Sequence, residues 1–185
     1  MAKHKHVIHL SEVPVDKINA PEGSVFSGSR QRVGAQIGAQ KLGYSFFTVP
    51  PGWTAFPYHN HMGNEEMIYI IDGDGILRLG KDELAVSADT VVACPPGDFP
   101  HQLINTGSRE LRYLVVSTME YPDISEYPDS NKIGAYATSA GRPQTGFRAL
   151  YMRDRNVNYY DGEAGQEVER ILKSARRGAK DASAT

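Results

Sequence analysis

Four side chains of the types that bind metal ions lie between residues 59 and 101. His59 and His61 are two positions apart in "YHNHM", Glu66 follows five positions later, and His101 lies in "FPHQLIN". Successive side chains of a strand point to opposite faces, so an extended segment would place the first two histidines on one face. Imidazoles together with a carboxylate suit a divalent first-row metal, with coordination positions left for water or substrate. The same pattern is also typical of ordinary surface histidines, and the spacing alone leaves both interpretations open.

Short runs rich in Val, Ile, Phe and Tyr surround these four residues and must position them. Turn sequences such as "PPG", "DGDG" and "NTGS" separate the runs. The predicted strands are Tyr44–Val49, Trp53–His59, Glu66–Ile71, Ile76–Leu79, Glu83–Val86, Thr90–Cys94, His101–Asn105 and Leu111–Ser117. The segment "IIDGDGILRL" is predicted to be a hairpin with Asp and Gly in its turn. No helix-length pattern interrupts these strands, so we expect an all-β sandwich or small barrel rather than a parallel α/β sheet.

The segments that flank these strands carry weaker signals. We expect residues 1–42 to form an N-terminal extension that loops over the surface, and we assign no chemistry to it; residues 43–118 are the expected barrel core. Residues 119–185 are the expected C-terminal extension. Its first part, with two Tyr-Pro-Asp turns, is predicted to be irregular, although "GFRALYM" fits one further strand. A short terminal helix is predicted from the helical spacing of Val168, Ile171, Leu172 and Ala175.

Two segments together resemble the paired motifs of the cupin superfamily. The first, "GWTAFPYHNHMGNEEMIYIIDG", contains Gly, His-x-His, four residues, Glu, six residues and Gly; the second, "CPPGDFPHQLIN", contains Pro-x-Gly, His, three residues and Asn. The sequence is similar to single-domain bacterial cupins of unassigned function, some of which are labelled sugar-phosphate isomerase-like. The resemblance implies an all-β double-stranded β-helix of the jelly-roll kind.

The resemblance also implies a ligand set for one divalent metal ion, which would be Zn, Mn, Fe, Ni or Co. The implied ligands are His59, His61, Glu66 and His101. Strand alternation lets only one of the adjacent Glu65 and Glu66 face the histidines. Glu66 is favoured because it alone keeps the six-residue step of the motif to Gly73.

Three functions are compatible with such a site. The leading hypothesis is a metal-dependent enzyme that acts on a small polar molecule such as a sugar phosphate. The reaction would be isomerase-like, with Glu65 or a histidine as the candidate proton-shuttling base. A metal-dependent dioxygenase is the alternative within the enzyme class. A non-catalytic cupin that binds or senses a small ligand is the third.

Several other residues carry two interpretations each. Trp53, Phe56, Tyr58 and Phe99 could line a ligand pocket, although core or loop packing is the commoner role of such residues. Asn105 could support a metal ligand or stabilise a turn with its amide. The arginines are numerous enough to bind a phosphate or carboxylate, but the sequence does not say which of them point inward.

Composition excludes some classes of function. The 185 residues contain 20 Lys and Arg against 22 Asp and Glu, for a net charge of −2, so no global basic field favours nucleic acid or a membrane surface. The one cysteine, Cys94, excludes an intramolecular disulfide and fits a small buried residue in a reducing compartment. We therefore expect one folded cytoplasmic domain, without nucleic-acid or membrane partners, that binds a small molecule and forms a homodimer.

Overall fold

The computed structural model describes residues 4–18, 20–139, 142–163 and 165–173. It divides into two units, Met1–Asp154 and Arg155–Thr185. In the second unit residues 166–173 are helical, which confirms the predicted short terminal helix. Its residues Val168, Ile171 and Leu172 are exposed, whereas Ala175 lies outside the described residues. No helix within the described ranges has both the length and the apolar composition needed to span a bilayer.

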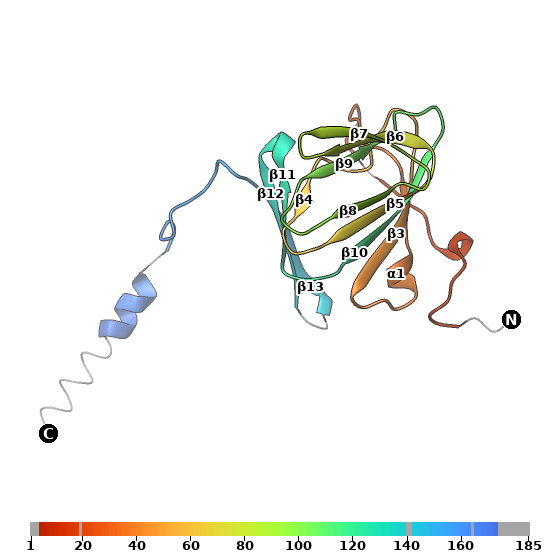
Figure 1. Cartoon of the computed structure of the whole chain (residues 1–185). Helices are drawn as coiled ribbons and strands as arrows, with labels where there is room; N and C mark the ends of the chain where they lie inside the picture. The colour runs from red at the N-terminus through yellow and green to blue at the C-terminus, as the bar shows by residue number, and fades with distance from the viewer. Residues whose placement is uncertain (1–3, 19, 140–141, 164, 174–185) are drawn as a thin grey trace, which may run out of the picture. The chain divides into compact units, whose positions relative to one another are not determined.

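The first unit is built from antiparallel strands in three sheets (Figure 1), which confirms the predicted all-β fold. The largest sheet has the order β1 (Asp16–Lys17), β2 (Ser29–Arg32), β3 (Leu42–Val49), β10 (Leu111–Thr118), β5 (Glu66–Asp72) and β8 (Val91–Cys94). The second has the order β7 (Asp82–Ser87), β6 (Asp74–Leu79) and β9 (His101–Ile104). The third has the order β13 (Arg142–Met152), β12 (Lys132–Ser139), β11 (Asp123–Tyr127) and β4 (Asn60–His61). The described residues of this unit also contain three short helices: η1 (Leu10–Glu12), α1 (Val33–Gln36) and η2 (Pro128–Ser130).

The hydrophobic core lies between the first two sheets. Figure 1 shows β6, β7 and β9 over the face of the sheet that contains β3, β10, β5 and β8. The fully buried members of the core include Val49 on β3, Ile70 on β5, Leu77 on β6 and Leu111 on β10. Alternate residues of these strands face the core, which is the pattern the sequence predicts for two packed sheets.

The predicted strand Trp53–His59 is wrong. Only Thr54 and His59 make isolated bridges in this stretch, and the regular strand is the short β4 that follows. Pro57 has no N–H to donate to a ladder, so a proline in this position works against a continuous strand. Its carbonyl instead accepts a hydrogen bond from the ring of His59.

The predicted hairpin in "IIDGDGILRL" is also wrong. β5 pairs with β10 and β8, whereas β6 pairs with β7 and β9, so the two consecutive strands belong to different sheets. The chain bends at Gly73, which has a φ of +91°, and a Cβ at this position would lie 2.5 Å from the Glu110 carbonyl oxygen. Glycine therefore permits a corner between two packed sheets, not a reversal within one sheet.

Both flanking segments contain more sheet than predicted. Residues 123–139 and 142–152 form β11, β12 and β13 where mostly irregular chain was expected, although "GFRALYM" does lie in β13. In the N-terminal segment, β2 pairs with β3 and extends the large sheet. Both additions reach the cavity described next.

Candidate metal centre and cavity

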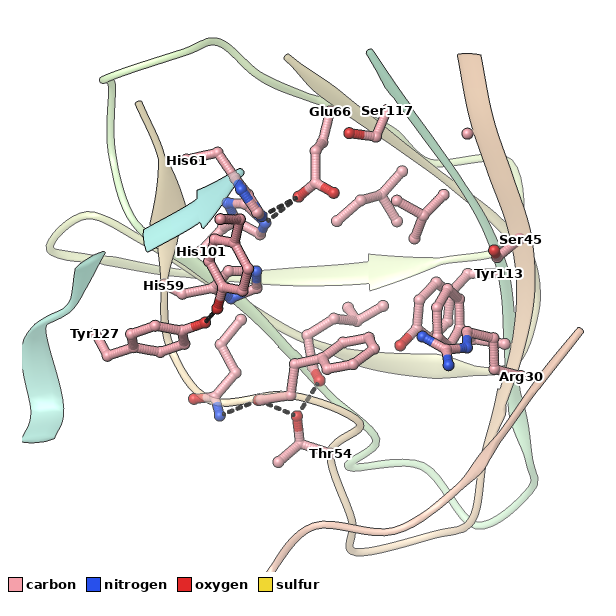
Figure 2. Close-up of a pocket in the computed structure, with 18 of the residues that line it drawn as sticks. Arg30, Ser45, Thr54, His59, His61, Glu66, His101, Tyr113, Ser117 and Tyr127 are labelled. Carbon is pink, nitrogen blue, oxygen red and sulfur yellow. Dashed lines mark hydrogen bonds and ion pairs between the residues drawn. The ribbon is translucent and has the colours of Figure 1, made fainter. Parts of the chain in front are cut away.

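The structure brings the four predicted metal ligands together from three short strands and one bridge. His61 lies on β4, Glu66 begins β5 and His101 begins β9, while His59 makes a backbone bridge to His101. One potential ligand atom from each of His59, His61 and Glu66 lies within 4.8 Å of the other two. The Glu66 carboxylate approaches Nε2 of His101 at 3.2 Å and Nε2 of His61 at 3.7 Å (Figure 2). Residues up to 42 positions apart in the chain thus meet at one point.

His59 is held as a neutral ring. Its Nδ1–H donates to the Pro57 carbonyl at 2.8 Å, which leaves Nε2 as the nitrogen with a free lone pair. Burial, with the charge of His101 acting in the same direction, lowers the pKa of His59 from 6.5 to about 4. A neutral imidazole with an available Nε2 is the form that coordinates a metal.

His61 is oriented by an acidic residue from the C-terminal strands. The Nδ1 atom lies 2.6 Å from Oδ2 of Asp123 on β11, and 3.1 Å from the Ser125 hydroxyl oxygen. The other oxygen of Asp123 accepts a hydrogen bond from the Gly63 backbone N–H at 2.9 Å. A carboxylate on one ring nitrogen fixes the tautomer of a ligating histidine and directs the other nitrogen at the metal. Asp123 stands in "YPDIS", a segment in which the sequence pattern indicates only a turn.

Glu66 remains ionised inside the cluster. Burial acts to raise its pKa, but the hydrogen bond from His101 and the charges of the histidines outweigh burial and hold the pKa below its ordinary value. His101 is buried, and its Nδ1 has no hydrogen-bond partner among the described residues, so the pairing of this ring is through Nε2 toward Glu66. A carboxylate surrounded by imidazoles with Nε2 atoms turned inward fits a divalent metal ion.

A cavity of about 370 Å³ opens beside this cluster. Its walls come from both sequence motifs and from both flanking segments, including Arg30 on β2, Tyr136 on β12 and Arg148 on β13. Two arginines, Arg30 and Arg148, are among the residues that line the cavity. The N-terminal segment, to which no chemistry was assigned, therefore contributes a guanidinium to it.

The aromatic residues suggested as pocket lining divide between the two interpretations. Phe56 lines the cavity. Tyr58 is buried, and its hydroxyl donates to the Gly80 carbonyl at 2.5 Å, so it serves packing. Trp53 and Phe99 are exposed and do not line the cavity.

Two tyrosines that the sequence did not point to stand next to the cluster. The ring of Tyr127 stacks on His59 with 5.9 Å between centroids, and its hydroxyl lies 2.7 Å from the hydroxyl of Tyr136. Burial and the contact with Tyr136 raise the pKa of Tyr127 well above its ordinary value. The Tyr127 hydroxyl is therefore protonated near neutral pH, and the hydroxyls of both tyrosines can form hydrogen bonds with a polar ligand.

The structure also places the remaining candidates. Glu65 is exposed and does not line the cavity. Its backbone N–H donates a hydrogen bond to the Thr118 hydroxyl oxygen. The Asn105 amide donates to the carbonyls of Val49 and Arg109, both at 2.8 Å, so it stabilises a turn and supports no metal ligand. Cys94 is buried, and burial raises the pKa of its thiol to about 12.

Comparison with known proteins agrees with this fold. Residues 45–117 match the family model described as a cupin domain. These residues are a cupin domain. An uncharacterized protein of Methanocaldococcus jannaschii is 32% identical over 63 residues, which are 34% of this chain and 50% of that protein. The chain thus aligns with about half the length of this curated relative.

Solved structures show the same cupin fold at low identity. A structure described as a sugar phosphate isomerase from the cupin superfamily of Silicibacter pomeroyi superposes with a TM-score of 0.70 at 20% identity, over 84% of this chain and 98% of that one. A structure described as a predicted oxalate decarboxylase of Thermotoga maritima gives a TM-score of 0.54 at 22% identity, over 62% and 99%. The double-stranded β-helix predicted from the motifs is confirmed by these similarities.

Proposed function

We propose that this cupin is a metal-dependent enzyme that acts on a small polar molecule, with one divalent metal held by His59, His61, Glu66 and His101. One observation carries the proposal: inward-facing imidazoles and an ionised carboxylate converge at the wall of a cavity large enough for a small ligand. A cavity of about 370 Å³ is at the small end of the range for ligand pockets, which favours a metabolite over a macromolecular segment.

The residues of the chain prepare this site before any ligand enters. Pro57 and Asp123 fix the ring orientations of His59 and His61, so little ordering remains to be done on binding. Tyr127 and Tyr136 line the cavity with hydroxyl groups that can form hydrogen bonds to the oxygens of a substrate. A metal bound here would act as a Lewis acid that polarises a carbonyl or stabilises a developing oxyanion.

We propose an isomerase-like reaction on a sugar phosphate as the chemistry. The similarity in fold to the Silicibacter pomeroyi protein supports this choice, as does a cavity that combines hydroxyl, guanidinium and imidazole groups. Glu65 is exposed outside the cavity, so the proton transfer must use a group of the wall. A homodimer and a cytoplasmic location remain predictions from the sequence.

Elemental analysis tests the metal site. The chain is purified without chelator or nickel resin and compared with the His59→Ala, His101→Ala double variant and with His9→Ala, which alters an exposed histidine. Near-stoichiometric metal in the wild type and in His9→Ala, with none in the double variant, is the expected result. Equal metal in all three proteins would contradict the site.

Exchange with solvent tests the reaction. The metal-loaded protein is incubated in D₂O with a panel of aldose and ketose phosphates, and deuterium at the carbon next to the carbonyl is followed by proton NMR. An isomerase that transfers a proton incorporates deuterium even when the product is not identified in advance. Oxygen consumption without deuterium would replace the isomerase by a dioxygenase, and ligand binding with neither would indicate a non-catalytic cupin.

A further inference from the structure

The side of the cavity away from the histidines carries a guanidinium that the family-matched residues do not supply. Arg30 lies on β2, outside residues 45–117, and Figure 2 shows it with Ser45 and Tyr113 across the pocket from His59 and His61. Arg30 pairs in register with Phe47 of β3, whose ring stacks on Tyr113 at 5.2 Å. The register thus places Arg30 beside Phe47, and both residues line the cavity.

The charge of Arg30 is poorly compensated by the protein. Its Nε is buried and has no hydrogen-bond partner among the described residues. The Asp16 carboxylate forms an ion pair with Arg30 at 3.9 Å, but it lies closer, at 2.8 Å, to the guanidinium of Arg32. Burial lowers the pKa of Arg30, with the charge of Arg32 acting in the same direction and Asp16 opposing them. An arginine stays protonated under such shifts, so a partly buried cation lines the cavity with its Nε–H unpaired among the described residues.

The sheet register gives the separation, along the strands, between the backbone rows of Arg30 and Glu66. Glu66 pairs with Ser117, and Ser117 pairs with Gly43, which puts these residues in one row across the sheet. Arg30 belongs to the row of Phe47, four residues farther along β3 than Gly43. At roughly 3.3 Å per residue the two rows are about 13 Å apart along the strands. A ligand that touches both ends must therefore have several bonds between its two polar ends.

We infer that Arg30 binds the anionic group, a phosphate or carboxylate, of an elongated small ligand whose other end reaches the histidine cluster. A guanidinium presents a planar fork that pairs with either anion through two parallel hydrogen bonds, and such charge-assisted bonds are strong in a partly buried site. The inference rests on the proposed function for the other end of the ligand. The anion site itself requires no metal.

Binding of simple anions to the chelator-treated full chain at pH 8 tests this inference. The probes are inorganic phosphate and acetate, titrated by calorimetry, and at this pH His59 is neutral and does not compete for the anion. We expect Arg30→Gln to weaken binding of the preferred anion at least about tenfold. Arg32→Gln is the matched control, because it removes the same charge from the same strand but from a residue that does not line the cavity; it should change binding less than about threefold.

The outcomes separate cleanly. Preference for phosphate or for acetate identifies the chemistry of the anionic group. No binding by the wild type, equal binding by Arg30→Gln, or equal losses in both variants would overturn the inference. If Arg30→Gln lowers the melting temperature too far for titration, Arg30→Lys keeps the charge and loses the fork, and its binding should still be weaker than that of Arg32→Gln. The metal content of the Arg30 variants should equal that of the wild type, so a failed anion site and a failed metal site give different results.

Discussion

The two sides of the cavity differ in how their residues are encoded. The histidine side is built from residues 59–101, within the cupin domain, at spacings visible in the sequence. The flanking strands β2 and β11–β13 supply further lining residues, with Arg30 opposite the histidines and Tyr127 beside them, and these strands carry no recognisable motif. The motifs of the cupin domain therefore account for the predicted metal ligands, whereas the flanking strands supply wall residues that no motif predicts. Ligand specificity is expected to reside in the flanking strands, and metal binding in the motif.

The adjacent carboxylates Glu65 and Glu66 give the sharpest test of the motif side. Glu66→Gln should lower metal affinity by more than about 100-fold, since the loss of a ligand should exceed the 10- to 100-fold cost of losing a supporting group. Glu65→Gln should leave metal affinity unchanged, because Glu65 is exposed. Competition with a chromogenic chelator measures both constants. A loss of metal affinity in Glu65→Gln equal to that in Glu66→Gln would contradict the assignment of Glu66 alone to the face that carries the histidines.

The acid sensitivity of the metal-free protein tests the environment of His59. The folded state lowers the pKa of this ring from 6.5 to about 4, so between these values the unfolded chain binds a proton that the folded chain does not. The contribution of this ring to the free energy of unfolding is therefore fully present above pH 6.5. It is lost as the pH falls toward 4, and the loss is at most about 3 kcal/mol. Glu66, whose pKa is also lowered, adds a loss in the same direction at more acidic pH.

Urea unfolding at pH 7 and pH 4.5 measures this loss. The variant His59→Gln has no ring to protonate and should show a smaller difference between the two pH values. His9→Ala, at an exposed position, should show the same difference as the wild type. An identical pH dependence in wild type and His59→Gln would mean that His59 is not buried as described.

Asp123 links the flanking strands to the metal-binding motif, because its side chain extends from β11 to His61. Asp123→Asn should lower metal affinity by about 10- to 100-fold, less than Glu66→Gln, since it removes the charge that orients the ring and keeps the ring itself. Asp129→Asn, on the nearby helix η2, breaks an ion pair with Arg78 and serves as control. If Asp123→Asn binds metal like the wild type, the flanking strands do not support the metal site.

Arg148 gives the smallest expected effect. It lines the cavity from β13, but it is exposed, with its guanidinium 5.6 Å from the centroid of the Tyr136 ring. Water screens an exposed charge, so Arg148→Gln should weaken binding of inorganic phosphate less than about threefold. Calorimetry beside Arg30→Gln compares the two arginines directly. A larger loss of phosphate binding in Arg148→Gln than in Arg30→Gln would assign the anion site to Arg148 and contradict the inference for Arg30.

The strands of the cupin domain could be predicted because alternating apolar residues and turn residues are local signals. Most predicted strands in residues 43–118 appear with boundaries shifted by one or two positions, as β3 and β10 show. The two exceptions are the predicted strand Trp53–His59 and the predicted hairpin. Pro57 cannot donate a hydrogen bond to a strand ladder, and Gly73 allows the chain to turn a corner between two sheets. A pattern of alternation cannot tell a hairpin from a bend into a second sheet.

The sequence by itself determined the fold class, the cupin domain and the four residues that meet beside the cavity. The fold class follows from local alternation and turn signals. The cupin domain and the four residues follow from the resemblance of two short motifs to those of the cupin superfamily. Only the tertiary structure decided that the candidate base Glu65 lies outside the cavity, that Asn105 holds a turn, and that Asp123 orients His61. It also placed Arg30 in the cavity through the pairing of β2 with β3. Contacts between residues far apart in the chain depend on sheet register, and no local pattern records that register.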